Sequence, residues 1–206
     1  MWFLGRGGVP RLPGLEAVRD GEEIRRLYRE LLEYLQGRRT RLEWPLDLRL
    51  ARSDFHRMVL ELTARIPYGA VTSYANVARD LGRPSAVRAV AQALRANPVP
   101  IAIPCHRVVG ADGDLTGYAG KRIGLKQRLL AVEGIQTVRK PGDLRVLREA
   151  MYVRDGHEPE YCVPTCGALP RRSLAELTLF ASRERAESCG LRPCTTCRPD
   201  LHPLPR

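Results

Sequence analysis

A cysteine followed directly by a histidine carries the strongest chemical signal in this sequence. Cys105 and His106 end an apolar, proline-rich run that starts at Asn97 and reads NPVPIAIPCH. A thiol held rigidly beside an imidazole suits nucleophilic chemistry, because the thiolate is the reactive species and the imidazole can take its proton. The alternative is an inert cysteine at a strand end, since free cysteines are among the most buried residues. The pair alone favours that alternative, so the neighbouring residues must decide.

Four further cysteines form two close pairs near the end of the chain. They make a C-x3-C and a C-x2-C motif separated by 27 residues, while Cys189 fits neither pair. Paired cysteines at this spacing are typical of a tetrahedral zinc site and rarely occur as unrelated thiols. The sequence therefore predicts zinc bound by Cys162, Cys166, Cys194 and Cys197.

Charge is concentrated around the Cys-His pair. The 206 residues carry a net charge of +11, and residues 51–140 alone hold 14 Lys and Arg against 6 Asp and Glu, a net +8. A basic surface that served only solubility would spread its charge more evenly. The concentration favours a nucleic-acid partner for this segment.

No stretch of the sequence resembles a signal peptide or a membrane span, which argues against a membrane partner. We therefore expect a cytoplasmic protein, associated with the nucleoid when bound to DNA. Thiols stay reduced in that compartment, so six cysteines indicate metal binding or catalysis before disulfides.

The elements that must position these residues are mostly helices. Residues 20–23 are typical of a capping box, and an apolar stripe at helical spacing follows, predicted to pack in the core: Ile24, Leu27, Tyr28, Leu31 and Leu35. A second helix is predicted to start after Ser53.

Two short helices are then predicted over residues 73–81 and 85–96, separated by Gly82, which is a helix-turn-helix pattern. On the second of these helices Arg88, Gln92 and Arg95 share one face, opposite the apolar one. They form either a solvated surface or a face presented to DNA.

Several motifs of this sequence match those of a known protein family in order and spacing. Residues 46–135 resemble the C-terminal catalytic domain of the O6-alkylguanine-DNA alkyltransferases, the methylated-DNA–protein-cysteine methyltransferases. The motifs that match in order and spacing are Ile66–Gly69, Ser73–Tyr74, Arg88–Val90, Asn97–Pro100, Ile103–Val109, Gly117–Tyr118 and Leu129–Gly134.

The resemblance implies roles in a displacement at saturated carbon. Cys105 would be the nucleophile, His106 would take its proton through water, and Glu133 would orient and stabilise the imidazole. Asn97 would build the turn around the cysteine, and Tyr74 would help rotate the nucleotide and protonate the departing guanine. Glu133 considered by itself is an exposed carboxylate at a helix end. The thioether product implies one turnover per cysteine, with no cofactor at this site.

The resemblance also implies that the target base leaves the double helix. Arg88 would fill the gap from the minor groove, and Gln92 and Arg95 lie on the same DNA-binding face. Tyr118 and the backbone around Val108 would line the base pocket. Ala119 stands where many relatives have serine, which removes one donor to the base. A related non-enzymatic family has tryptophan at the cysteine position and binds alkylated DNA without repairing it.

Residues 151–201 resemble the zinc module of the adaptive-response (Ada-type) repair proteins. The matching pieces are Tyr161–Cys166, Phe180–Ser182 and Gly190–Asp200. In that family the cysteine matching Cys162 takes a methyl group from a methylphosphotriester. The alternative is that zinc only holds the fold, and residues 157–160 before Cys162, which include two glutamates, depart from the family pattern.

We therefore expect an α/β fold: a helix-rich alkyltransferase domain with a helix-turn-helix, winged-helix-like DNA surface, and a small zinc-bound α+β module. The expected division is an abridged helical region over 1–45, a catalytic domain over 46–138, a linker over 139–148 and a zinc domain over 149–202. The expected function is single-turnover alkyl transfer from O6-alkylguanine in double-stranded DNA to Cys105, by a protein expected to be a monomer. A damage-binding protein without activity, or a zinc-dependent regulator, is the alternative.

Overall fold

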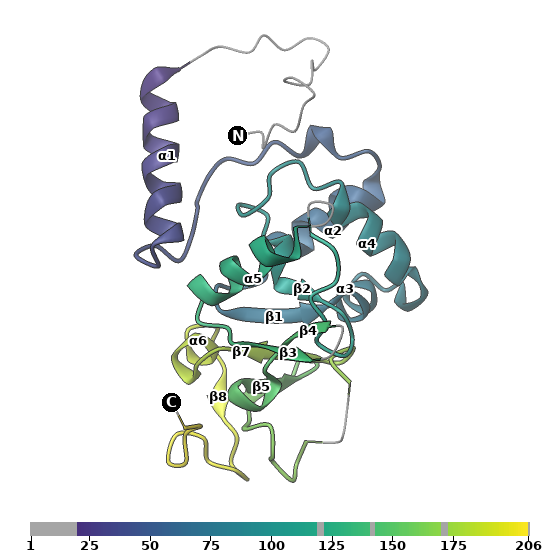
Figure 1. Cartoon of the computed structure of the whole chain (residues 1–206). Coiled ribbons are helices and arrows are strands. Elements are labelled where there is room, and N and C mark those ends of the chain that lie inside the picture. The colour runs from purple at the N-terminus through teal and green to yellow at the C-terminus, as the bar shows by residue number, and fades with distance from the viewer. Residues whose placement is uncertain (1–19, 119–121, 141–142, 170–172, 206) are drawn as a thin grey trace.

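Most helices come before residue 133 and most strands after residue 136 in the computed structural model, which describes residues 20–118, 122–140, 143–169 and 173–205 (Figure 1). The α-helices are α1 (Gly21–Leu35), α2 (Asp54–Ala64), α3 (Tyr74–Asp80), α4 (Val87–Arg95), α5 (Ile123–Val132) and α6 (Arg183–Glu187). The strands are β1 (Ala70–Ser73), β2 (Val108–Val109), β3 (Thr137–Lys140), β4 (Asp143–Val146), β5 (Tyr152–Asp155), β6 (Glu160–Tyr161), β7 (Leu177–Phe180) and β8 (Arg192–Pro193). The expected α/β class is confirmed.

One four-stranded sheet joins the two halves of the chain. Its strand order is β2-β1-β7-β5, with β1 parallel to β2 and antiparallel to β7. Thr72 aligns with Val108 on one side of β1, and Ala70 aligns with Phe180 on the other. Strands β1 and β2 belong to the expected catalytic domain, whereas β7 and β5 belong to the expected zinc domain. A single hydrogen-bonded layer therefore crosses the predicted boundary.

The segment expected as a linker is largely a hairpin. Strands β3 and β4 pair antiparallel over four residue pairs, from Thr137 opposite Val146 to Lys140 opposite Asp143. Pro141 and Gly142, which suggested a boundary, lie outside the described residues. Proline and glycine mark a hairpin turn as readily as a domain boundary, so their presence did not distinguish the two. The domain limits themselves stay a prediction.

The two faces of the sheet are covered by different parts of the chain. Val71 and Leu179 belong to an apolar cluster with residues of α5 and β4, whereas Ala70 and Phe180 belong to a second cluster with residues of β6 and α6. This alternation follows from the period of two along a strand. Figure 1 shows α5 on one side of the sheet and α6 with β8 on the other.

Capping residues delimit the helices before and within the predicted helix-turn-helix. Ser53 accepts a hydrogen bond from the backbone N–H of His56 at 3.1 Å, and Ser73 accepts one from Asn76 at 3.0 Å. Gly82 takes a left-handed φ of 69° directly after α3, a conformation that favours glycine. The buried face of α4 consists of Val90, Ala93 and Leu94.

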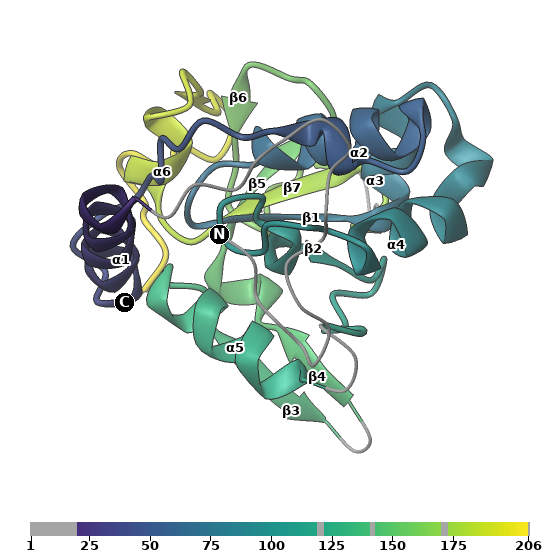
Figure 2. The same ribbon diagram turned by 90° about the horizontal axis from the view of Figure 1, so that it is seen from above.

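Helix α1 differs from its expected role. Asp20 caps it by accepting from the backbone N–H groups of Glu22 and Glu23. The apolar stripe expected in the core is largely exposed, with Ile24 at 53% and Tyr28 at 59% exposure. Helix α1 stands at the side of the molecule (Figures 1 and 2), so little of its apolar stripe is covered. Periodicity therefore identified the helix but not the face that meets the body. Tyr34 is the one residue of α1 that is fully buried.

None of the helices in the described part of the chain combines the length and the apolar composition that crossing a bilayer requires.

Candidate active site and metal centre

Cys105 lies in a tight loop between α4 and the sheet. It opens a single 3-10 turn, Cys105–Arg107, that leads directly into β2, and its side chain is buried at 8% exposure. Ile101 in the same loop has a φ of +77°, a conformation in which a β-branched residue is strained. Parallel pairing of β2 with β1 holds the end of the loop.

Asn97 fixes the thiol from the other side. Its side-chain amide donates to the carbonyl of Ile103 at 2.9 Å and to Sγ of Cys105 at 3.1 Å. Its own amide oxygen accepts from the backbone N–H of Val99 at 3.0 Å. Burial raises the pKa of Cys105, whereas the Asn97 hydrogen bond and the charge of Lys126 act in the opposite direction. The thiol therefore needs a base before it can react.

His106 is fully buried and its two ring nitrogens differ. Nε2 lies 2.6 Å from Oε1 of Glu133, and among the described residues no hydrogen-bond partner reaches Nδ1. A carboxylate only accepts, so Nε2 carries the proton in this contact and Nδ1 keeps its lone pair. Burial lowers the pKa of His106 despite the opposing effect of Glu133. The imidazole is thus neutral and basic at Nδ1.

Glu133 lies at the C-cap of α5 and is 3% exposed. Its Oε2 accepts from the backbone N–H of Gly69 at 3.0 Å and from Nε of Arg107 at 2.9 Å, and its Oε1 accepts from Nη2 of Arg107 at 3.0 Å. Burial raises the pKa of Glu133, but His106 and Arg107 outweigh it and bring the pKa to about 2. The residue is therefore a buried carboxylate with every oxygen engaged, not the exposed terminal residue that its position alone suggests.

Two tyrosines lie near the thiol. The Tyr118 ring is edge-on to His106 with centroids 6.5 Å apart, and Tyr74 is half-buried. Burial raises the pKa of both tyrosines, and the nearby Cys105 raises it further. Val108 is fully buried and its carbonyl accepts from Nζ of Lys126 at 2.6 Å. Ala119 lies outside the described residues.

The three polar residues predicted on α4 lie on its open face. Arg88, Gln92 and Arg95 are exposed, opposite the apolar face that packs into the core. Asn97 follows α4 by two residues, so the helix is directly connected to the loop that holds Cys105. The exposed face of α4 and the buried thiol thus belong to one local unit.

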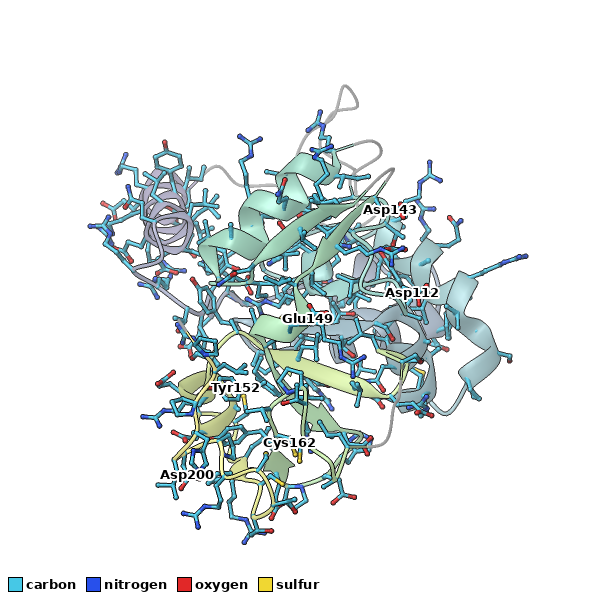
Figure 3. The ribbon with its side chains drawn as sticks, turned by 60° about the horizontal axis from the view of Figure 1, so that its bottom comes forward. Asp112, Asp143, Glu149, Tyr152, Cys162 and Asp200 are labelled. Atoms are coloured by element: carbon cyan, nitrogen blue, oxygen red, sulfur yellow. The ribbon has the colours of Figure 1, made fainter. Side chains whose placement is uncertain are left out.

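Four cysteines gather in the last fifty residues. Their sulfur atoms all lie within 4.8 Å of one another, and the set consists of Cys162, Cys166, Cys194 and Cys197. Parallel pairing of β6 with β8 places Tyr161 opposite Pro193, and the residue that follows each strand is a cysteine of the cluster. Figure 3 labels Cys162 beside yellow sulfur atoms in this part of the molecule. Four clustered thiols suit a tetrahedral metal ion, and Cys189 lies apart as an exposed thiol.

Comparison with known proteins accounts for both groups of residues. Residues 54–135 match the family model described as "6-O-methylguanine DNA methyltransferase, DNA binding domain", and residues 159–200 match "Metal binding domain of Ada". The inducible methylated-DNA–protein-cysteine methyltransferase of Bacillus subtilis is 42% identical over 110 residues, covering 53% of this chain and 60% of that protein. The solved structure of Mycobacterium tuberculosis OGT in complex with DNA is 43% identical, with a TM-score of 0.49 and coverage of 52% of this chain and 63% of that one.

One relative is covered over most of its length. The methylated-DNA–protein-cysteine methyltransferase of Methanosarcina barkeri is 39% identical over 121 residues, which make up 58% of this chain and 76% of that protein. The chain belongs to the methylated-DNA–protein-cysteine methyltransferase family. It spans about 60% of the length of the Bacillus relatives, and its metal-binding segment is matched separately.

Within this member of the family, sequence reasoning missed three residues at the site. Arg107 lies within the Ile103–Val109 motif, which by itself indicates no role for it, and it donates to both oxygens of Glu133. Lys126 is fully buried and also donates to the carbonyl of Thr116 at 3.2 Å. Tyr34 of α1 donates to Oε1 of Glu133.

The sequence did hold a signal for one of these residues. Arg outnumbers Lys by 31 to 3 in the whole chain, so a lysine at position 126 is unusual. A compact ammonium group fits between two carbonyls where a planar guanidinium does not. Burial lowers the pKa of Lys126 to about 8. No comparable signal marks Arg107 or Tyr34.

Proposed function

We propose that this protein repairs DNA by direct reversal of alkylation damage, transferring the alkyl group of O6-alkylguanine to Sγ of Cys105. The arrangement that supports the proposal is a buried thiol held by Asn97 next to a neutral imidazole whose Nδ1 meets no hydrogen-bond partner in the described part of the chain. Glu133 at Nε2 of that imidazole stabilises the charged form that appears when Nδ1 takes a proton. Membership of the methyltransferase family supports the same chemistry.

The proposed reaction has three steps: a proton transfer, a displacement at carbon and a second proton transfer. The thiol proton of Cys105 passes through water to Nδ1 of His106, and the thiolate attacks the alkyl carbon. A carbon–sulfur bond forms while the bond from that carbon to O6 breaks, and the electron pair leaves with guanine. Tyr74 helps to deliver a proton to the departing base. The thioether does not revert, so each molecule acts once.

The proposed partner is double-stranded DNA that carries the lesion. Guanine O6 is not accessible in stacked DNA, so the nucleotide must rotate out of the helix. Arg88 is proposed to fill the vacated space, and Gln92 and Arg95 to contact the DNA from the same exposed face. Tyr118, the Val108 backbone and Ala119 are proposed to line the base pocket. The cytoplasmic location and the monomeric state stay predictions.

The metal of the second site is proposed to be Zn²⁺, held by the four clustered cysteines, with no cofactor at Cys105. Zinc would keep the cysteine thiols deprotonated and therefore nucleophilic. Cys162 is proposed as a second methyl acceptor, for methylphosphotriesters, because it is the first cysteine of the segment matched by the metal-binding domain of Ada. Its 7% exposure means that an incoming phosphotriester must approach closely.

The test is the mass of the intact protein after incubation with duplex DNA containing one O6-methylguanine, followed by peptide mapping. One methyl increment on the Cys105 peptide is expected, and Cys105→Ala should abolish it while DNA binding persists. The same assay with methylphosphotriester DNA tests Cys162. An unmodified protein that still binds the lesion DNA would establish the competing function, a damage-binding protein without activity.

A further inference from the structure

Helix α1 contributes one side chain to the interior of the site. Tyr34 is 1% exposed and is packed edge-on against Tyr68 with ring centroids 5.7 Å apart. Ile24 and Tyr28 of the same helix are exposed, whereas Leu31 packs against the same core cluster as Tyr34. Tyr34 also lies outside residues 54–135, which the alkyltransferase family model matches.

The Tyr34 hydroxyl lies among the groups that control the imidazole. It donates to Oε1 of Glu133, accepts from Nη2 of Arg107 at 3.1 Å, and lies 3.5 Å from Nε2 of His106. Burial and the Glu133 carboxylate raise the pKa of Tyr34. The hydroxyl therefore stays protonated and acts as a donor over the working pH range.

Oε1 of Glu133 is shared between His106, the Tyr34 hydroxyl and Arg107. It accepts from Nε2 of His106 at 2.6 Å and from the Tyr34 hydroxyl. Together with Arg107 and the Gly69 N–H, these donors leave the carboxylate a single orientation. That orientation decides which nitrogen of His106 carries the proton.

We propose that Tyr34 is a positioning residue for the alkyl transfer: its hydroxyl holds Glu133 so that His106 keeps its proton on Nε2 and offers Nδ1 to the proton of Cys105. The inference rests on the proposed function. Tyr34 gains and loses no proton itself. The thiol proton goes to Nδ1, and the imidazolium that results is compensated by Glu133.

The sign of the effect on His106 follows from its surroundings. The ionisable groups that face the imidazole are Glu133 and Lys126 from the α5 region, Arg107 and Cys105 from its own turn, Tyr118 and Tyr34. Removing the Tyr34 hydroxyl takes a donor from Oε1, which then binds the His106 proton more strongly. The pKa of His106 rises, so less of the basic form is present at low pH.

The variant Tyr34→Phe tests this role because it keeps the ring packed against Tyr68. The measurement is the single-turnover methylation rate of Cys105 on duplex DNA with O6-methylguanine, from pH 5 to pH 9. We expect a rate about tenfold lower at pH 7, typical of losing a group that orients a catalytic side chain. The acid limb of the profile should move to higher pH, while DNA affinity stays unchanged. Tyr28→Phe, on the exposed face of α1, is the matched control with wild-type behaviour.

A rate reduced by one factor at every pH, or a wild-type profile, would show that Tyr34 only anchors the helix. Should Tyr34→Phe fail to fold, 3-fluorotyrosine at position 34 supplies a stronger donor with the same shape. The acid limb should then move to lower pH, and an unmoved limb would overturn the inference.

Failure of the proposed function would appear differently, as a wild-type protein that transfers no methyl group. The ¹⁵N shifts of the His106 ring still test Tyr34 in that case. Protonation at Nε2 in the wild type and a higher pKa of His106 in Tyr34→Phe, followed through these shifts as the pH is varied, are expected. An equal pKa of His106 in the two proteins would contradict the assignment.

Discussion

Gly69 donates its backbone N–H to the buried carboxylate of Glu133 at 3.0 Å, while its carbonyl accepts from the N–H of Ala181 at 2.7 Å. One residue directly before β1 thus contacts the proposed catalytic relay through its N–H and the end of β7 through its carbonyl. Arg185 of α6 lies over the ring of the preceding residue, Tyr68, at 4.7 Å. The metal-binding half of the chain therefore supports the groups around Cys105 directly.

Gly69→Ala should destabilise the protein and slow methyl transfer. Gly69 has a φ of +74°, and a Cβ there would lie 3.2 Å from the carbonyl oxygen of Glu133. We expect a loss of about 1–3 kcal/mol in the free energy of unfolding. Urea denaturation measures it, with Gly124→Ala in open space on α5 as the control. Equal stability of wild type and Gly69→Ala would mean that β1 adapts to the side chain.

Acid should weaken the fold through Glu133. Folding lowers its pKa from 4.5 to about 2, so its contribution to stability is present above pH 4.5 and is lost as the pH falls toward 2. At pH 7 the variant Glu133→Gln should be less stable than wild type, on the order of 3 kcal/mol. The gap should narrow between pH 4.5 and pH 2 in denaturant titrations. A gap independent of pH would contradict an ionised, charge-paired Glu133.

Arg88→Ala should impair reaction with duplex DNA more than reaction with the free alkylated base. An arginine that fills the space of an extruded nucleotide matters only when there is a stack to open. We expect the ratio of the two single-turnover rates to fall at least tenfold, a change of about 1.4 kcal/mol. Arg128→Ala, an exposed arginine on α5, should leave the ratio unchanged. Equal losses on both substrates would remove the extrusion role.

Metal removal should affect the whole chain and not only its last fifty residues. Metal analysis should find one zinc ion per molecule. A chelator should lower the temperature of a single unfolding transition of the whole chain, because β5 and β7 share a sheet with β1. Cys166→Ser should reproduce the loss, while Cys189→Ser, outside the cluster, should not. Two separate transitions, with only one sensitive to the chelator, would show that the halves fold independently.

The local features of this protein were accessible from its sequence. The cap at Ser53 and the glycine after α3 act through neighbouring residues, so short-range patterns reveal them. The spacing of the four cysteines likewise predicted a cluster that the structure contains.

Long-range pairing was not accessible in this way. The alignment of Ala70 with Phe180 joins strands more than a hundred residues apart, and the sequence of neither strand identifies the strand with which it pairs. The burial of Tyr34 instead of Ile24 and Tyr28 likewise depends on where α1 meets the body. Helical periodicity identifies an apolar face but cannot say whether another element covers it.

The pairing of β1 with β7 bears on how such a chain can be shortened or recombined. A product that ended before β7 would leave the backbone of β1 as an open edge, and open edges recruit strands from other molecules. Fragments carrying only the first half should therefore self-associate unless another strand takes the vacant place. Loss of the metal-binding segment should therefore lower the solubility of the half that carries Cys105.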